Sequence, residues 1–153
     1  MRNLSVSVLL LGMVAPAFAD ATAQAKKHDE AFAKACNAGD VNAVMTLYTD
    51  DAFVIWPDVG EEARGKAEIE KLVTKLCNPK LGTKGVLKDD VGVQLDRSHI
   101  AIIGHWELTQ NGPDGKPATS QIRTSEIIVK RAGGWRYMVD HASVGTAAAA
   151  PAK

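Results

Sequence analysis

The segment RTSEIIVKRAGGWRYMVDHAS, residues 123–143, decides the fold class of this chain. Two apolar-rich runs flank Gly133-Gly134, a pattern typical of a β-hairpin. Polar side chains interrupt these runs where a sheet that only covers a core would carry aliphatic residues: Arg123, Glu126, Asp140 and His141. The segment therefore predicts a sheet that borders a polar pocket as well as a core.

Helices precede this sheet in the chain. Strong helix formers, an Asp40 N-cap and an apolar stripe at helical spacing indicate helices over 21–38, 40–48 and 65–77. Runs of strand character indicate strands over 52–56, 86–95, 99–109, 121–131 and 135–144. The order helix, helix, strand, helix and then four antiparallel strands predicts a single α+β domain.

The first residues have the pattern of an export signal. Arg2 is followed by an apolar run over 4–14 and by the small-x-small site Ala17-Phe18-Ala19, as in a secretory signal peptide. The alternative is an uncleaved membrane anchor. We expect a signal peptide at 1–19, the domain at 20–145 and a disordered tail at 146–153. A periplasmic or secreted protein without membrane contact after cleavage follows from this interpretation.

Charge and cysteines limit the partners. The chain has 18 basic and 18 acidic residues, a balance that gives no reason to expect nucleic acid or an anionic membrane as partner. Cys36 and Cys77 would meet an oxidising compartment, and each lies near the end of an expected helix, so we predict a disulfide between them; two buried free thiols are the alternative. The scattered histidines show no paired ligand spacing, so no metal site is predicted.

Three stretches carry a family resemblance: residues 38–52, residues 64–69 and the hairpin 123–143. In this order the chain, from about Gln24 to Ser143, resembles the nuclear transport factor 2-like superfamily, and within it SnoaL-like and ketosteroid-isomerase-like domains. The resemblance implies a cystatin-like fold, in which a cone-shaped, curved antiparallel or mixed sheet is wrapped by three N-terminal helices, with a pocket at the wide end. It also implies a homodimer formed through the outer face of the sheet.

The hairpin supplies two candidate site residues. Arg123 matches an arginine that faces the cavity in SnoaL-like domains; it either anchors a carboxylate or enolate oxygen or forms a salt bridge at the cone mouth. His141 is either a general base or a hydrogen-bonded structural histidine. Strict alternation places Glu126 and Asp140 on the opposite faces of their strands.

Four more residues are candidates elsewhere. Asp58 is a conceivable base and Tyr48 a conceivable hydrogen-bond donor, although neither lies in a motif that matches the isomerases residue by residue. Trp56 lines either the cavity or the core. His105, beside Glu107 on one strand face, belongs either to a catalytic pair or to a solvated edge.

Two functions follow as hypotheses. The first is a small-molecule-binding domain whose cone holds a partly apolar ligand, with or without ketosteroid-isomerase-like proton transfer next to a carbonyl. The second is a non-catalytic homo-oligomerisation or protein-assembly module. No phosphate loop, G-x-S-x-G elbow or dinucleotide fingerprint occurs in the sequence, so we expect no cofactor.

Overall fold

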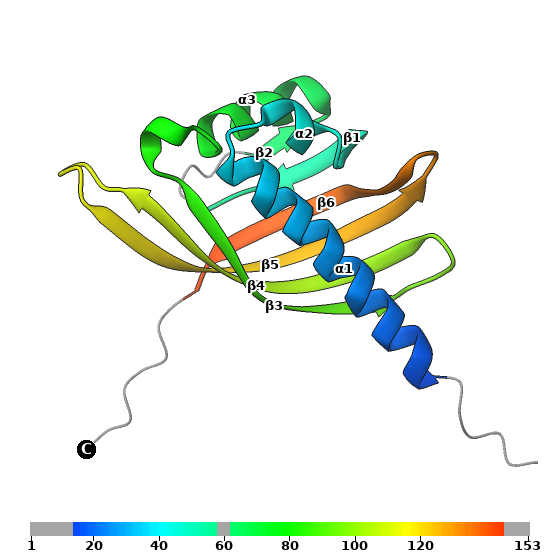
Figure 1. Cartoon of the computed structure of the whole chain (residues 1–153). Helices are drawn as coiled ribbons and strands as arrows, with labels where there is room; N and C mark the ends of the chain where they lie inside the picture. The colour runs from blue at the N-terminus through cyan, green and yellow to red at the C-terminus, as the bar shows by residue number, and fades with distance from the viewer. Residues whose placement is uncertain (1–13, 58–61, 146–153) are drawn as a thin grey trace, which may run out of the picture.

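The structure, a computed structural model, describes residues 14–57 and 62–145 (Figure 1). Most of the expected signal peptide, the expected tail at 146–153 and the candidate base Asp58 lie outside the described residues. The proposed cleavage point after Ala19 falls within the first helix, α1 (Val14–Asn37).

A curved, mixed sheet of six strands forms the body of the described part. The strands are β1 (Tyr48–Ile55), β2 (Glu62–Arg64), β3 (Lys84–Gln94), β4 (His99–Asn111), β5 (Pro117–Arg131) and β6 (Gly134–Val144). Their order in the sheet is β2-β1-β6-β5-β4-β3, with β1 and β6 parallel and all other neighbours antiparallel. The predicted α+β class is confirmed, and the hairpin of β5 and β6 lies in the middle of the sheet.

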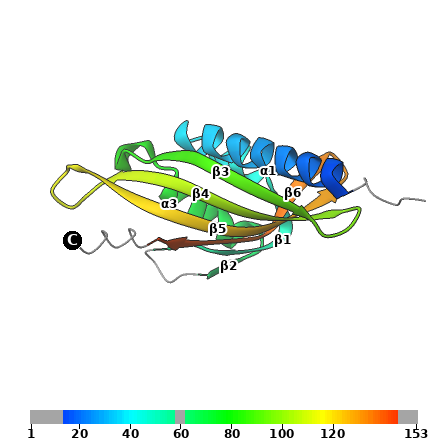
Figure 2. The same ribbon diagram turned by 90° about the horizontal axis from the view of Figure 1, so that it is seen from below.

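The helices lie on one side of this sheet (Figure 1). Helix α1 runs across it and packs along β3, as the second view also shows (Figure 2). Helices α2 (Val41–Met45) and α3 (Lys66–Leu76) pack on one another at the far end, and a short 3₁₀-helix, η1 (Pro79–Leu81), follows α3. None of the helices in the described ranges is long and apolar enough to cross a membrane.

The second helix is shorter than its sequence suggests. We expected it to reach Tyr48, but α2 ends at Met45 and Tyr48 is the first residue of β1. The Thr46 hydroxyl donates a hydrogen bond back to the Ala43 carbonyl, at 2.7 Å, and competes with the helical ladder at this point. The consequence for the site is that Tyr48 joins the sheet next to β6.

The predicted disulfide is confirmed. Cys36 near the end of α1 is bonded to Cys77 at the end of α3, with a Cα–Cα distance of 4.7 Å. Both residues belong to the hydrophobic core. The bond therefore joins two helices that cover the same end of the sheet.

A β-bulge in β6 sets which side chains face the helices. Val139 pairs with Ile127 and Tyr137 with Ile128, so Met138 is an extra residue without a partner on β5. The inside-outside alternation shifts by one residue there. As a result Tyr137, Asp140 and Ala142 are all buried, while His141 is exposed.

Candidate functional site

The register of the sheet aligns the inward polar residues in two neighbouring rows. One row across β3, β4 and β5 consists of Asp90, Gly104 and Thr124; the next, across β4, β5 and β6, consists of Ile102, Glu126 and Asp140. Thr124, Glu126 and Asp140 are all buried. Polar groups therefore occupy the floor of a space that the helices close from the other side.

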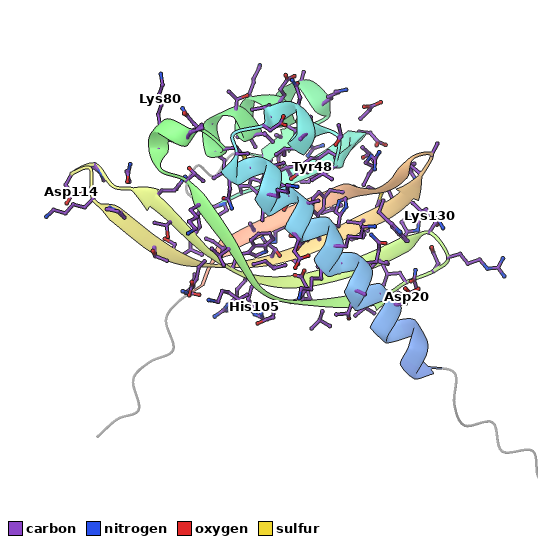
Figure 3. All side chains as sticks on the ribbon, viewed as in Figure 1. Asp20, Tyr48, Lys80, His105, Asp114 and Lys130 are labelled. Carbon is purple, nitrogen blue, oxygen red and sulfur yellow. A yellow bond between two sulfur atoms is a disulfide. The ribbon has the colours of Figure 1, made fainter. Side chains whose placement is uncertain are left out.

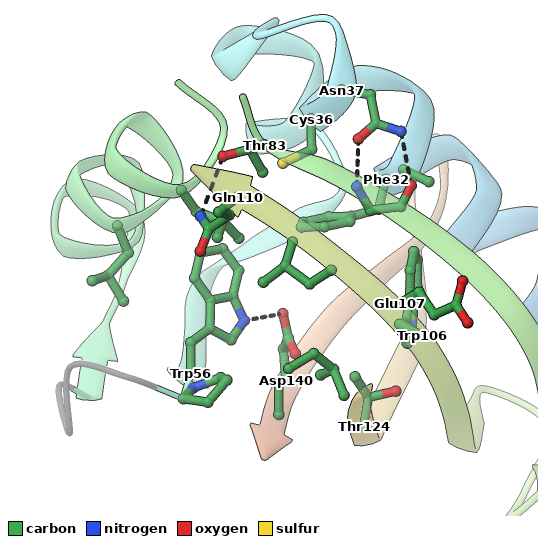
Figure 4. Close-up of a pocket in the computed structure, with 18 of the residues that line it drawn as sticks. Phe32, Cys36, Asn37, Trp56, Thr83, Trp106, Glu107, Gln110, Thr124 and Asp140 are labelled. Carbon is green, nitrogen blue, oxygen red and sulfur yellow. Dashed lines mark hydrogen bonds between the residues drawn. The ribbon is translucent and has the colours of Figure 1, made fainter. Parts of the chain in front are cut away.

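This space is a cavity of about 260 Å³ between α1, α3 and the sheet (Figure 4). Its walls are largely apolar, with the side chains of Phe32, Trp56, Leu72, Leu76, Trp106, Leu108 and Ile122. Cys36 also lines it, so the disulfide forms part of the wall. A small apolar cavity with a few converging polar groups is the usual form of a small-molecule site.

Asp140 is the best-anchored polar group in the cavity. Its Oδ2 accepts a hydrogen bond from the Tyr48 hydroxyl, at 2.5 Å, and another from Trp56 Nε1, at 3.0 Å, of which Figure 4 draws the second. Burial raises the pKa of Asp140, and these two hydrogen bonds lower it. Two donors fixed on one oxygen orient the carboxyl group and offset part of the effect of burial, which leaves the pKa of Asp140 above its usual value.

Glu126 is the second carboxyl group on the cavity floor. It pairs with Asp140 across β5 and β6, and its side chain is buried. Its Oε2 has no hydrogen-bond partner among the described residues. Burial, together with the nearby Asp29 and Asp140 carboxyl groups, raises the pKa of Glu126 well above its usual value. Glu126 is therefore the acid of the pair that keeps its proton.

The structure corrects the predicted orientation of Arg123 and His141. Both are exposed on the sheet face away from the helices, and neither lines the cavity. His141 points outward because the Met138 bulge reverses the alternation. Arg123 does share a face with Ser125 and Ile127, but that face is the outer one. Aliphatic neighbours did not identify the cavity side, because the outer face carries them too.

The other candidates divide between the two faces. Trp56 lines the cavity, as expected, and Tyr48 is buried beside it, where its hydroxyl contacts Asp140. His105 lies on the side of the sheet away from the helices (Figure 3) and bonds through Nδ1 to Asp89, at 2.6 Å. Its pairing with a solvated acid favours the alternative of a solvated edge over a catalytic pair.

Sequence reasoning set aside the two acids that face the cavity, Glu126 and Asp140. Their presence in apolar runs is the signal that marks them, because carboxyl groups rarely occupy such positions without a role. Alternation correctly placed them opposite Arg123 and His141, but the cavity was then assigned to the face of Arg123 and His141. The described residues contain no group of three or more His, Cys, Asp or Glu side chains arranged to hold a metal ion.

Comparison with known proteins supports this description of the fold. The sequence profile of the SnoaL-like domain matches residues 27–147. No curated protein matches the chain.

Solved structures with the same fold are distant in sequence. A ketosteroid isomerase-like protein from Erwinia carotovora atroseptica is 21% identical, with a TM-score of 0.68 over 85% of this chain and 100% of that one. A putative dehydratase from the NTF2-like family of Streptomyces avermitilis is 15% identical, with a TM-score of 0.71 over 84% of this chain and 99% of that one.

A third similar structure is a putative calcium/calmodulin dependent protein kinase II association domain from Xanthomonas campestris. It is 23% identical, with a TM-score of 0.66 over 95% of this chain and 97% of that one. At these identities the likeness concerns the fold alone. The profile match covers most of the chain, and the chain therefore belongs to the SnoaL-like domain family.

Proposed function

We propose that this domain binds a small, largely apolar carbonyl compound in its cavity and transfers a proton next to the carbonyl group. The observation that carries the proposal is Asp140, a buried carboxyl group that faces an apolar cavity and is held by Tyr48 and Trp56. Such a group, desolvated and oriented, is suited to act as a general base. Asp140 replaces His141 and Asp58 as the base that the sequence suggested.

The two hydrogen bonds give the two carboxyl oxygens of Asp140 different roles. Both donors reach Oδ2. Oδ1 is then the oxygen that takes the proton from the carbon next to the carbonyl group. When the proton is returned to a different carbon the reaction is an isomerisation, and when a leaving group departs it is a dehydration or another elimination.

Glu126 supplies the complementary acid. It is buried opposite Asp140, and its environment holds it in the neutral form. A neutral carboxyl group donates a hydrogen bond, here to the oxygen of an enolate as negative charge develops on it. Two carboxyl groups whose pKa values are separated by their surroundings can divide the acid and base roles in this way.

The cavity limits the class of ligand. Its walls consist mainly of aromatic and aliphatic side chains, and its volume of about 260 Å³ accommodates a compound of one or two rings. A carboxylate ligand is disfavoured, because the floor already holds the carboxyl groups of Asp140 and Glu126, and Lys75 is the one basic residue among the described residues that line the space. Neutral aryl or alicyclic ketones fit this chemistry best.

Binding and exchange together test the proposal. Acetophenone and 1-indanone are suitable probes, since both are small, neutral and carry exchangeable protons next to a carbonyl group. We expect them to raise the midpoint of thermal unfolding, because a ligand that binds only the folded state stabilises it. We also expect the protein to accelerate the exchange of these protons for deuterium, followed by NMR. Binding without exchange would reduce the domain to a carrier, and the absence of both would refute the proposal.

The second hypothesis, an assembly role, finds support on the outer face of the sheet. Val91 and Ile103 are paired neighbours there, with 50% and 46% of their surfaces exposed, and Ile127 lies close to them in the next strand. Exposed aliphatic residues that gather on one face are typical of an interface between proteins. The similar Xanthomonas structure is itself described as a putative association domain, which supports a role in association.

Sedimentation velocity distinguishes this role from the first. We expect a dimer for the natural protein and a monomer for Ile103→Lys, with ketone binding unchanged because Ile103 does not line the cavity. A natural protein that sediments as a monomer at all concentrations would refute the dimer and leave the cavity chemistry unaffected.

Export to the periplasm or the exterior also belongs to the proposal. The signal-like pattern of residues 1–19 supports it, and so does the disulfide between Cys36 and Cys77, a bond that persists in oxidising compartments. Mass spectrometry of the protein from cell fractions tests it, since export predicts a chain that begins at Asp20.

A further inference from the structure

Asp29 is a buried carboxyl group that the chemistry of Asp140 and Glu126 does not use. It lies on α1 and is completely inaccessible to solvent. Its Oδ1 accepts a hydrogen bond from the Tyr137 hydroxyl, at 2.5 Å, whereas Oδ2 has no partner among the described residues. Tyr137 itself lines the cavity. Asp29 is therefore one hydroxyl group away from the ligand space.

The packing of α1 on β3 places a second acid beside Asp29. Thr22 bonds to the Gly92 backbone, and Asn37 bonds to the Gly85 backbone, so both ends of the contact are fixed. Asp29 lies about two helical turns from Thr22 and about two from Asn37, on the same face of the helix. This position is opposite the middle of the β3 segment, where Asp90 points inward.

Asp90, like Asp29, has a buried carboxyl oxygen without a hydrogen-bond partner among the described residues, and in Asp90 this is true of both oxygens. The Asp90 and Asp29 carboxyl groups are close enough for each to affect the pKa of the other. Two neighbouring carboxyl groups away from water do not readily both ionise, because their like charges repel and burial removes the water that would solvate them. One proton between them would supply the missing donor for Asp29 Oδ2.

Asp90 also connects this pair to the surface. It lines a groove whose other residues are Lys26, Glu30, Leu87, Lys88 and Asp89. A path of neighbouring polar groups thus connects the cavity to the surface groove. It runs from Tyr137, which lines the cavity, through Asp29 to Asp90, which lines the groove.

We propose that Asp29 and Asp90 hold one proton between them and exchange protons with the cavity through the Tyr137 hydroxyl, as a reservoir for the proton that Asp140 handles. This proposal rests on the proposed function, because it assigns the reservoir to that same site. A proton that reaches Tyr137 Oη from the cavity displaces the hydroxyl proton to Asp29 Oδ1, and the proton on Asp29 Oδ2 moves to Asp90. Tyr137 is neutral before and after, and the pair has gained the one proton that the cavity has lost.

The surroundings of the pair are mostly acidic. Burial and the neighbouring Asp90 raise the pKa of Asp29 to about 8. Burial also raises the pKa of Asp90 to about 6. The other titratable or charged groups that face the pair are Lys26, His28 and Glu30 on α1, Tyr48 on β1, Asp89 on β3, Glu126 on β5, and Tyr137 and Asp140 on β6. His28 does not supply a positive charge at neutral pH, because burial lowers its pKa to about 4.

An NMR titration of the full domain tests the shared proton without a ligand. With aspartate labelled with carbon-13 at the side-chain carboxyl, we expect the Asp29 and Asp90 signals to titrate near pH 8 and pH 6. Asp90→Asn should lower the pKa of Asp29, because it removes the neighbouring charge. Asp89→Asn is the matched control: Asp89 is adjacent in sequence but exposed and paired with His105, and its charge acts on Asp90, so the Asp29 signal should remain near pH 8 while the pKa of Asp90 falls. Aspartates that all titrate below about pH 5 in the natural protein would overturn the proposal.

The link to the cavity is tested with 4-nitrophenol as the probe. Its binding should shift the Asp29 signal in the natural protein and leave it unchanged in Tyr137→Phe, with circular dichroism to verify that the variant is folded. A shift that survives in Tyr137→Phe would overturn the role of the hydroxyl. If 4-nitrophenol does not bind although the ketones do, the exchange with the cavity is overturned and the proposed function stands. If the ketones do not bind either, the proposed function fails as well, while the shared proton is decided by the titration alone.

Discussion

Glu126 on β5 stands directly opposite Asp140 on β6, and both carboxyl groups face the cavity between the sheet and the helices. They differ in their hydrogen bonds. Asp140 receives two donors on one oxygen, whereas Glu126 Oε2 receives none from the described residues. The pair therefore combines a carboxyl group whose ionised form is supported by two donors with one whose pKa is raised well above its usual value, at one position in the sheet.

Asp140→Asn tests the base directly. The asparagine keeps an oxygen for Tyr48 and Trp56 but cannot accept a proton. We expect the exchange of ketone protons for deuterium to fall by a factor of roughly 10² to 10⁴, the usual contribution of a general base, while ketone binding persists. The control is His141→Ala, the next residue in sequence, which is exposed on the outer face. A loss of exchange in the control alone would restore the base suggested by the sequence.

Tyr48→Phe tests how the base is tuned. The variant removes one of the two donors that favour the ionised carboxylate, so the pKa of Asp140 should rise further. The alkaline form of the enzyme is the active one in this scheme. The pH profile of proton exchange should therefore shift to higher pH. Trp56→Phe removes the second donor and should shift the profile in the same direction; an unchanged profile in both variants would contradict the role of Asp140.

The buried acids predict a stability that falls as the pH rises. The pKa of Asp29 is raised to about 8 and that of Asp90 to about 6, mainly by burial, so the folded state binds more protons than the unfolded state between about pH 4 and about pH 8. Each excess proton lowers the free energy of unfolding by about 1.4 kcal/mol per pH unit. Urea unfolding at several pH values measures this slope. It should be smaller in Asp29→Asn, and a stability that increases over this range would contradict the assignment.

Gly92 marks the closest approach of β3 to α1. A Cβ at this position would lie 2.4 Å from the Ala21 carbonyl oxygen, so Gly92→Ala must push the helix off the strand. We expect a loss of about 1–3 kcal/mol in the free energy of unfolding, as for other overpacked sites. Gly85 is the matched control on the same strand, because its nearest contacts would be 3.9 Å away. Chemical denaturation of both variants measures the difference, and equal effects would show that the helix does not rest on Gly92.

Loss of the disulfide should also be measurable. The bond between Cys36 and Cys77 closes a loop with a sequence separation of 41 residues, for which chain entropy alone gives about 4 kcal/mol. The double variant Cys36→Ala/Cys77→Ala should unfold at a correspondingly lower urea concentration. Because Cys36 lines the cavity, ketone binding should weaken as well; a variant with unchanged stability would mean that packing alone fixes the two helices.

The periodic parts of the fold were predictable from sequence. Local residue spacing is enough to recognise the apolar stripe of α3, the long strands and the Gly133-Gly134 turn. Tyr48 was misplaced in a helix because its neighbours continue a helical pattern, whereas its place in β1 depends on pairing with Tyr137 of β6, which is distant in sequence. The three residues of β2 carry too little pattern to be recognised.

The site was less predictable than the fold, because the sequence does not show which face of β5 and β6 borders the cavity. Arg123 and His141 carry the chemistry that active sites often use, and both face outward. The inward residues of β6 follow from the unpaired Met138, and a bulge of this kind depends on how β6 pairs with β5 rather than on the residues of β6 alone. Asp29 shows the same limit: a helix pattern marks it as one more charged residue on α1, and only the packing on β3 buries it.

The extra residue in β6 has a consequence for how this architecture diversifies. A regular strand with the same residues around Asp140 would turn Val139 and His141 inward, and the cavity would contain an imidazole in place of a carboxylate. Gaining or losing one unpaired residue therefore exchanges the whole set of reactive groups in a single step, without replacing any of them. Families built on this sheet have a route to new chemistry that a comparison of aligned residue types does not reveal.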